Sequence, residues 1–276
     1  MTLRGLESVL SAAGVPEPKN DLLILAGLAS GFSFASLLAR YDEDISAAAW
    51  YSELEALVSR REKREPLQYI AGQADFYGET YRVTPDTLIP RPDTETLVDY
   101  ALTRLRDGCR AADLCCGSGI IGIAICKKAD VLCDSLDISP KALAVAQENA
   151  KALGVCERMT FRLGDVFRGE GLSGQYDMIL SNPPYIKSGE LPSLAPELSY
   201  EPEIALDGGG DGVDFYRALL DGYEKNLSMS GEFVFEIGYD ESNEVGKIAC
   251  ERGFECRILR DLSKNPRAAV IKRRSD

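Results

Sequence analysis

The chain has 276 residues, with 31 Lys or Arg against 44 Asp or Glu, so its formal net charge is −13. This acidic balance argues against duplex DNA as the main partner, because affinity for DNA depends on neutralising phosphates. The chain contains no histidine, which excludes His-based catalytic triads, and because its cysteines also form no C-x-x-C pair the common zinc spacings are excluded too.

The first 66 residues are predicted to form a small helical bundle. Apolar residues recur at helical spacing over residues 3–10, and Gly14-Val15-Pro16 ends that helix. Asp21 is expected to cap a second helix through residues 22–25. Residues 34–38 predict a third helix and residues 47–64 a fourth, and Pro66 is expected to end the bundle.

Residues 67–92 are predicted to be a β-hairpin linker. The alternation over residues 76–83 around a central glycine is typical of a hairpin. Pro92 then suits the first turn of a helix that runs to about Leu105. Asp93 and Glu95 suit the N-terminal end of that helix, where the dipole favours negative charge.

From Arg110 onward strands and helices alternate, the pattern of a parallel sheet covered by helices on both faces. We therefore expect an α/β fold, with residues 93–276 forming a seven-stranded Rossmann-like domain. Residues 186–212 are polar and rich in Pro and Gly, which we interpret as a functional lid. The predicted strands are 111–115, 131–137, 159–163, 176–181, 232–237, 256–259 and 268–272, and the helices between them are 120–128, 139–154, 215–227 and 241–252.

A glycine-rich loop follows the first of these strands. Residues 117–122 read G-x-G-x-x-G and lead into a helix whose N–H groups would face a ligand. Asp137, 18 residues after Gly119, ends the second strand, where a carboxylate can accept both hydroxyls of a ribose. Asp165 follows the third strand, where it could accept an adenine amino proton. Asp113 fits a cofactor role and a purely supporting role for the loop equally well.

The tetrapeptide Asn182-Pro183-Pro184-Tyr185 follows the fourth strand. It suits a planar amide or aromatic amine whose nitrogen must attack a methyl donor, because that nitrogen is a poor nucleophile with a delocalised lone pair. The Asn182 side-chain oxygen and the Pro183 carbonyl can each accept one N–H and so aim the lone pair. The prolines fix the backbone, and the Tyr185 ring offers a flat face. A Pro-Pro turn at a strand end is the structural alternative.

These motifs together resemble the release-factor glutamine methyltransferases, the PrmC/HemK family. The resemblance is carried by residues 66–72, residues 88–95, the glycine loop, residues 182–186 and Glu201-Pro202 before Ala205-Leu206. The first 65 residues match only in being helical. The family implies a class I methyltransferase domain that binds S-adenosyl-L-methionine through Cys115, Cys116, Gly117, Ser118, Gly119, Asp137, Asp165, Val166 and Asn182. It also implies a substrate glutamine held by Asn182, Pro183, Pro184 and Tyr185, with Asn182, Pro183 and Tyr185 in catalytic roles.

The implied reaction is N5-methylation of the glutamine in the Gly-Gly-Gln motif of class 1 peptide chain release factors, without a metal. Residues 1–66 are expected to dock that protein substrate. An adenine-N6 methyltransferase acting on DNA or RNA is the nearest alternative, since it uses a similar tetrapeptide, but the acidic charge disfavours it. Cys115 stands where many such loops carry glycine, so we expect its backbone to avoid positive φ.

The sequence also predicts where the protein works. No N-terminal segment has the pattern of a signal peptide, and residues 22–39 are interrupted by Ser and Gly, so we expect no membrane span. The 8 cysteines form no C-x-x-C pair and are expected to be reduced. We therefore expect a cytoplasmic monomer without direct DNA binding.

Overall fold

A computed structural model describes residues 1–261 and 263–274 and divides the chain into two units. Unit 1 contains residues Met1–Gln73 and Ala195–Tyr200, and unit 2 contains the remaining described residues. The chain therefore passes from one unit to the other after Gln73, after Leu194 and after Tyr200. Each unit has its own buried apolar core.

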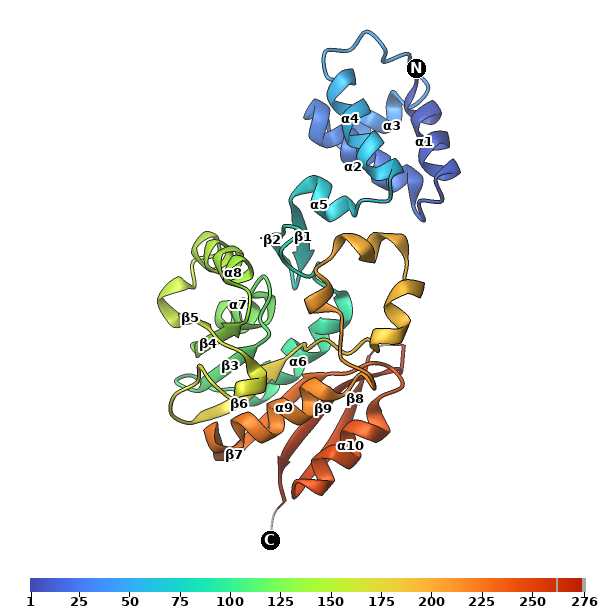
Figure 1. Ribbon diagram of the computed structural model, residues 1–276. Coiled ribbons are helices and arrows are strands. Elements are labelled where there is room, and N and C mark those ends of the chain that lie inside the picture. The colour runs from blue at the N-terminus through green and yellow to red at the C-terminus, as the bar shows by residue number, and fades with distance from the viewer. Residues whose placement is uncertain (262, 275–276) are drawn as a thin grey trace. The chain divides into compact units, whose positions relative to one another are not determined.

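Unit 1 is helical, as the sequence predicts. Its main helices are α1 (Leu3–Ala12), α2 (Pro18–Ser30), α3 (Phe34–Ala39), α4 (Tyr51–Glu62) and α5 (Leu67–Ala71) (Figure 1). Thr2 caps α1 by accepting a hydrogen bond from the Gly5 N–H, and the leucines of α1 are buried at helical spacing. The helices predicted near residues 3–10, 22–25 and 34–38 are confirmed.

Two details of the predicted bundle are wrong. Asp21 does not cap α2; it lies inside the first turn, which begins at Pro18. Pro66 does not end the helical part, because α5 starts directly after it with Pro66 as its N-cap residue. A proline fixes φ near the helical value, so it suits the start of a helix as well as the end of one.

Ion pairs from Arg61 and Arg64 to Glu197 join the two segments of unit 1. The Arg61 guanidinium donates to Asp21 over 2.8 Å and to Glu197 over 3.1 Å, and both Arg61 and Asp21 are buried. Arg64 donates twice to Glu197, at 2.7 Å each. The Tyr200 hydroxyl donates to the Lys63 carbonyl over 2.8 Å. Residues 195–200 therefore belong to unit 1 through specific polar contacts.

We predict that Arg61→Ala destabilises unit 1 by about 3–5 kcal/mol, because it leaves the buried Asp21 carboxylate without its partner. Arg60→Ala is the matched control, since Arg60 pairs with Glu65 at the surface. Urea unfolding followed by the fluorescence of Trp50, the single tryptophan of the chain, measures this difference. Equal midpoints for the two variants would contradict the prediction.

A hairpin follows the first helices along the chain. Its strands are β1 (Gln73–Phe76) and β2 (Glu79–Arg82), and the turn residues Tyr77 and Gly78 have φ of 51° and 79°. Positive φ at both central positions is typical of the tight turn that matches strand twist. The predicted hairpin is confirmed. The chain then enters a short 3-10 helix, η1 (Pro92–Thr94), followed by α6 (Glu95–Arg104).

The predicted seven-stranded sheet is confirmed. Its strands are β3 (Arg110–Leu114), β4 (Leu132–Asp137), β5 (Met159–Leu163), β6 (Tyr176–Ser181), β7 (Leu227–Glu236), β8 (Phe254–Arg260) and β9 (Pro266–Arg273). They lie in the order β5-β4-β3-β6-β7-β9-β8. The pairs from β5 to β7 are parallel, and β9 is antiparallel to both β7 and β8.

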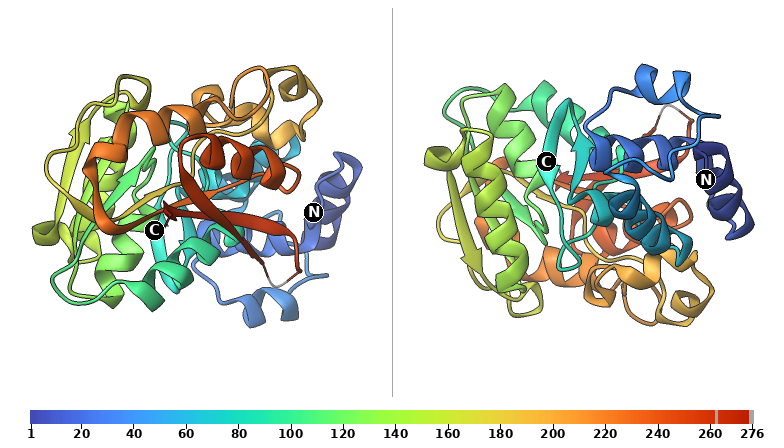
Figure 2. Two further views of the ribbon diagram at one scale, coloured as in Figure 1. Left: turned by 90° about the horizontal axis from the view of Figure 1, so that it is seen from below. Right: turned by 90° about the horizontal axis from the view of Figure 1, so that it is seen from above.

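Helices cover both faces of the sheet, and alternate strand residues face each layer. Helices α6, α7 (Ile120–Lys128) and α8 (Pro140–Ala152) share one core with Ala111, Met178 and Val234. Helices α9 (Asp214–Tyr223) and α10 (Ser242–Glu251) share the other core with Ala112 and Ile179. The left view of Figure 2 shows α9 and α10 on one side of β8 and β9 and α6 on the other. No helix in the described part of the chain has the length and hydropathy to span a lipid bilayer.

Candidate functional site

The strand order brings two predicted motifs together. Leu114 at the end of β3 pairs with Ser181 at the end of β6, so the glycine loop and the Asn182 tetrapeptide start side by side. Asp137 pairs with Leu163 in the same way on β4 and β5. Strands β4 and β5 are added on one side of β3, and β6 and β7 on the other, so the direction in which strands are added changes at β3. In open α/β sheets, ligands bind at the carboxyl ends of the strands where this change occurs.

A cavity of about 160 Å³ lies at these strand ends. Its lining combines strand-end residues from β3, β4, β5 and β6 with residues 86–88 and the segment that follows residue 201. Of the predicted site residues, Cys115, Gly117, Asp137, Asp165, Val166, Asn182 and Pro184 line it. The lining residues that were not predicted as site residues are Asp86, Thr87, Leu88, Leu136, Ile138, Ser139, Ala142, Gly164, Phe167, Pro202, Ile204, Ala205 and Phe215, of which Leu88, Pro202 and Ala205 lie in motifs that carry the family resemblance.

Three predicted cofactor residues do not line this cavity. The Cys116 N–H donates to the Leu136 carbonyl over 3.0 Å, and Cys116 is buried. Ser118 is buried beneath the loop. Gly119 has φ of 82°, and a Cβ there would lie 3.1 Å from the Cβ of Ala146 on α8. These positions let the loop turn and pack closely on its neighbours, and their predicted contact with a cofactor stays a prediction.

The expectation for Cys115 is wrong, because its φ is 57°. The backbone must turn sharply after β3 so that the Cys116 N–H can reach the Leu136 carbonyl. A non-glycine residue in this region costs roughly 1–2 kcal/mol. Cys115 therefore carries local strain at the point where its side chain meets the cavity, a combination common at functional sites.

Asp113 supports the loop and does not line the cavity. Its carboxylate accepts the Gly122 N–H over 3.0 Å and is completely buried. Burial raises the pKa of Asp113 to about 7, although the Gly122 N–H opposes this shift. Of the two roles left open, the geometry favours the supporting one.

The two carboxylates at the cavity are each held by backbone N–H groups. Asp137 accepts the Gly117 N–H over 2.8 Å and the Ser139 N–H over 2.9 Å, and its burial raises its pKa. Asp165 accepts the Phe167 N–H over 2.9 Å. Each carboxylate oxygen has a second lone pair, so both side chains are fixed in direction and still able to accept from a ligand.

Exposed apolar side chains flank these carboxylates. Ile138 is 48% exposed and Phe167 is 55% exposed, although both line the cavity. Such exposure at a hollow indicates a surface that a ligand covers. A ligand with a flat ring and neighbouring hydroxyls fits this arrangement, since the apolar groups can enclose the ring while Asp137 accepts from the hydroxyls. An adenosyl group has that chemistry.

Asn182 is connected to a buried carboxyl group. Its Nδ2 donates to the Thr94 hydroxyl over 3.2 Å, and that hydroxyl donates to Glu236 Oε2 over 2.6 Å. The Tyr185 hydroxyl donates to Glu236 Oε1 over 3.5 Å. Burial raises the pKa of Glu236 to about 7, while Thr94, Arg267 and Tyr185 oppose the shift. The sequence offered one signal for Glu236, an acidic residue at the end of an apolar strand.

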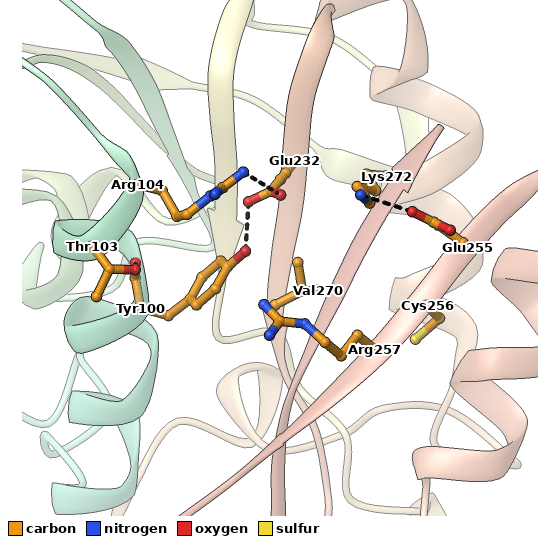
Figure 3. A pocket seen from close by; sticks show the side chains of 9 residues that line it. All are labelled: Tyr100, Thr103, Arg104, Glu232, Glu255, Cys256, Arg257, Val270 and Lys272. Atoms are coloured by element: carbon orange, nitrogen blue, oxygen red, sulfur yellow. Dashed lines mark hydrogen bonds and ion pairs between the residues drawn. The ribbon is translucent and has the colours of Figure 1, made fainter. Parts of the chain in front are cut away.

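A second hollow in unit 2, of about 560 Å³, contains none of the predicted site residues. It lies between α6 and strands β7, β8 and β9 (Figure 3). Glu232 accepts from the Tyr100 hydroxyl and pairs with Arg104, and Lys272 pairs with Glu255. The charged groups of these two pairs are thus neutralised by each other. Within residues 1–261 and 263–274, no cluster of Cys, Asp and Glu is arranged to hold a metal ion.

Comparison with known proteins agrees with this geometry. The release factor glutamine methyltransferase of Rhodospirillum rubrum is 38% identical over 272 residues, covering 96% of this chain and 82% of the relative. The chain belongs to that family. The enzyme of the same name from Moorella thermoacetica is 38% identical over 276 residues, covering 97% of this chain and 95% of the relative. The part of the chain that matches this family therefore includes both units. Family models for the PrmC N-terminal domain and the methyltransferase small domain match residues 2–72 and 93–211.

Solved structures of more distant proteins share the fold. A methyltransferase from Pyrococcus furiosus aligns with a TM-score of 0.55 at 17% identity, covering 77% of this chain and 96% of that one. The ribosomal protein L11 methylase of Lactobacillus delbrueckii subsp. bulgaricus aligns with a TM-score of 0.51 at 19% identity, covering 67% and 81%. The α/β class I methyltransferase fold is thus confirmed.

We predict that Glu236 makes the protein less stable as the pH rises. Its pKa is about 7 in the folded protein against 4.5 for the free side chain, so folding favours the protonated form. Between pH 5 and pH 8 the wild type should therefore lose about 2 kcal/mol of unfolding free energy relative to Glu236→Gln, which cannot ionise. Urea unfolding of both proteins at several pH values measures this. The same substitution at the exposed Glu157 is the control, and parallel pH profiles for wild type and Glu236→Gln would contradict the prediction.

Proposed function

We propose that this protein methylates the glutamine side chain in the Gly-Gly-Gln motif of class 1 peptide chain release factors, with S-adenosylmethionine as methyl donor. The observation that carries the proposal is the combination of two facts about one chain. It is 38% identical to release factor glutamine methyltransferases over nearly its whole length. It also has Asn182 beside a cavity whose two strand-end carboxylates and apolar walls fit an adenosyl group.

In this proposal the cavity residues hold the methyl donor. Asp137 accepts from the ribose hydroxyls and Asp165 from the adenine amino group, while Ile138 and Phe167 enclose the ring. Gly117 brings the loop backbone close to the ligand, which its φ of 54° allows. When bound, S-adenosylmethionine supplies a methyl group on a positively charged sulfur.

The tetrapeptide after β6 positions the acceptor nitrogen. The Asn182 Oδ1 and the Pro183 carbonyl each accept one N–H of the glutamine amide, and both stabilise the positive charge that develops on nitrogen. The prolines are buried, which keeps the backbone of this turn fixed. The Tyr185 ring packs on the amide plane. The amide proton leaves to water after the transfer, so the reaction needs no general base, in agreement with a chain that has no histidine.

The function is tested by incubating the protein with labelled S-adenosylmethionine and a purified class 1 release factor. Mass spectrometry should find the label on the Gly-Gly-Gln glutamine, at its side-chain nitrogen. A release factor in which this glutamine is replaced is the control and should stay unlabelled. Label on another residue, or on RNA added to the same reaction, would contradict the proposal.

We predict that Asn182→Ala removes most turnover but leaves S-adenosylmethionine affinity within an order of magnitude. The asparagine orients the acceptor amide, and lost orientation lowers the rate of a positioned reaction by about 100-fold. Single-turnover methyl transfer and calorimetric titration with S-adenosylmethionine measure the two effects separately. Near-normal turnover would contradict the positioning role of Asn182.

We further propose that unit 1 docks the release factor. A glutamine in a narrow pocket supplies little contact area, so selectivity for a large protein needs a second surface. Unit 1 exposes several large apolar side chains on α2, on α3 and in the segment between them: Ile24, Leu28, Phe32, Phe34 and Leu38. Ile24 and Leu28 are one helical turn apart, as are Phe34 and Leu38, so each pair shares one face of its helix.

Substitutions on α3 test this docking role. Phe34 and Leu38 are 51% and 40% exposed, so the double substitution to serine should leave unit 1 folded. We predict at least a tenfold loss of kcat/KM on the intact release factor and an unchanged rate on a short Gly-Gly-Gln peptide. Met229→Ser, at an exposed apolar residue of unit 2, is the matched control and should change neither. Equal losses on peptide and protein would contradict the docking role.

Deleting unit 1 would be a poorer test. Loss of residues 1–65 also removes Arg61 and Arg64, which hold Glu197. The segment that returns the chain to Glu201 would then lose its partners.

We also propose that the protein acts as a cytoplasmic monomer and does not bind DNA directly, in keeping with its net charge of −13 and its proposed substrate.

A further inference from the structure

Asn182 can serve the proposed reaction only if its side-chain amide is oriented with the oxygen, and not the nitrogen, towards the methyl-accepting group. A glutamine side-chain nitrogen carries N–H groups, which need an acceptor, so the Asn182 oxygen must face the acceptor group. An asparagine amide has nearly the same shape in both orientations. Something in the protein must therefore distinguish its oxygen from its nitrogen.

The contacts on the far side of Asn182 make this distinction. Thr94 lies 3.2 Å from the Asn182 Nδ2, and its hydroxyl has a single proton. That proton is donated to Glu236 Oε2 over 2.6 Å. A hydroxyl whose proton is already used can only accept, so it can bind the nitrogen of Asn182 but not its oxygen.

We propose that Thr94 and Glu236 set the orientation of the Asn182 amide and so present its oxygen to the methyl-accepting group. This inference rests on the proposed function, because it explains how the acceptor is held. Thr94 and Glu236 are positioning residues, since neither lines the cavity. Both are buried, with exposed fractions of 0% and 1%, so water does not compete for these hydrogen bonds.

The register of the sheet explains why these residues meet. Ser181 on β6 pairs with Phe235 on β7, so Asn182, the first residue after β6, lies level with Glu236, the last residue of β7. Thr94 comes from η1, directly before α6. The other groups that face Glu236 are Arg267 and Tyr185, which favour its charged form, and Asp93, which opposes it. Arg267 in turn pairs with Asp93 over 3.1 Å.

The same carboxyl also reaches the last residue of the tetrapeptide. Glu236 Oε1 accepts from the Tyr185 hydroxyl over 3.5 Å, while Oε2 accepts from Thr94. One buried side chain therefore holds the Tyr185 ring directly and the Asn182 amide through Thr94, and the proposed reaction uses both. A carboxylate suits this place because it only accepts hydrogen bonds, whereas an amide in its position could also donate and reverse the chain of donors.

Substitution of Thr94 tests the inference at pH 8, where Glu236 is mostly ionised. Thr94→Val keeps the shape but removes the hydroxyl, and Thr94→Ser keeps the hydroxyl. We expect single-turnover methyl transfer to the release factor to fall at least tenfold in Thr94→Val and to stay within threefold of wild type in Thr94→Ser. Affinity for S-adenosylmethionine should stay within twofold in both. Wild-type transfer by Thr94→Val, or an equal loss in Thr94→Ser, would overturn the inference.

A second measurement does not depend on methyl transfer. The side-chain N–H signals of Asn182 in a ¹⁵N spectrum can be assigned by their loss in Asn182→Asp. We expect slow exchange of these protons with solvent in wild type and Thr94→Ser, and at least tenfold faster exchange in Thr94→Val. Unchanged exchange in Thr94→Val would overturn the inference even if the release factor is methylated. A wild type with slow exchange that leaves the release factor unmethylated would contradict the proposed function alone.

Discussion

The site depends on one constraint, the parallel pairing of β3 with β6. Leu114 pairs with Ser181, and the Ser181 hydroxyl donates to the Leu114 carbonyl over 2.7 Å at the point where both strands end. The chain has already added β4 and β5 on the other side of β3 when β6 returns to it. Because the strands end at one level, the loops that follow them open into the same space. A shift of one residue in this register would turn the side chains that follow towards opposite faces.

Much of this arrangement could be predicted from the sequence. The glycine loop and the tetrapeptide were recognisable because their backbone requirements permit few residue types, and each followed an apolar run that reads as a strand. The ends of β5 and β6 and of α7 were predicted to the residue, since sharp changes in hydrophobic pattern mark them. The strand ends that line the cavity could therefore be predicted from the sequence.

The features that the sequence did not predict depend on contacts between segments that are distant along the chain. Nothing local distinguishes Thr94 from an ordinary residue at a helix start, and its partners Asn182 and Glu236 lie 88 and 142 positions further along the chain. Asp21 looked like a cap because aspartate often is one, and only the position of Arg61 revealed its actual role. The positive φ of Cys115 was missed for a similar reason, since the turn is imposed by the neighbouring strand β4 and not by local preference.

Three energetically unfavourable features belong to residues that form or support the site. Asp113 and Glu236 are buried carboxyls with pKa values of about 7, and Cys115 holds a strained backbone. Each costs folding free energy, so the large apolar cores on both faces of the sheet must offset them. This is the usual compromise between stability and a fixed functional geometry.

The two-part composition of unit 1 has a consequence for protein engineering and for evolution. Residues 195–200 are separated from residues 1–73 by more than a hundred positions, yet they belong to the same unit. A chimera that exchanges only the N-terminal segment between two relatives would join Glu197 of one parent to the arginines of another. A functional graft has to move both segments together, and recombination at a single crossover would separate partners that must be inherited as a pair.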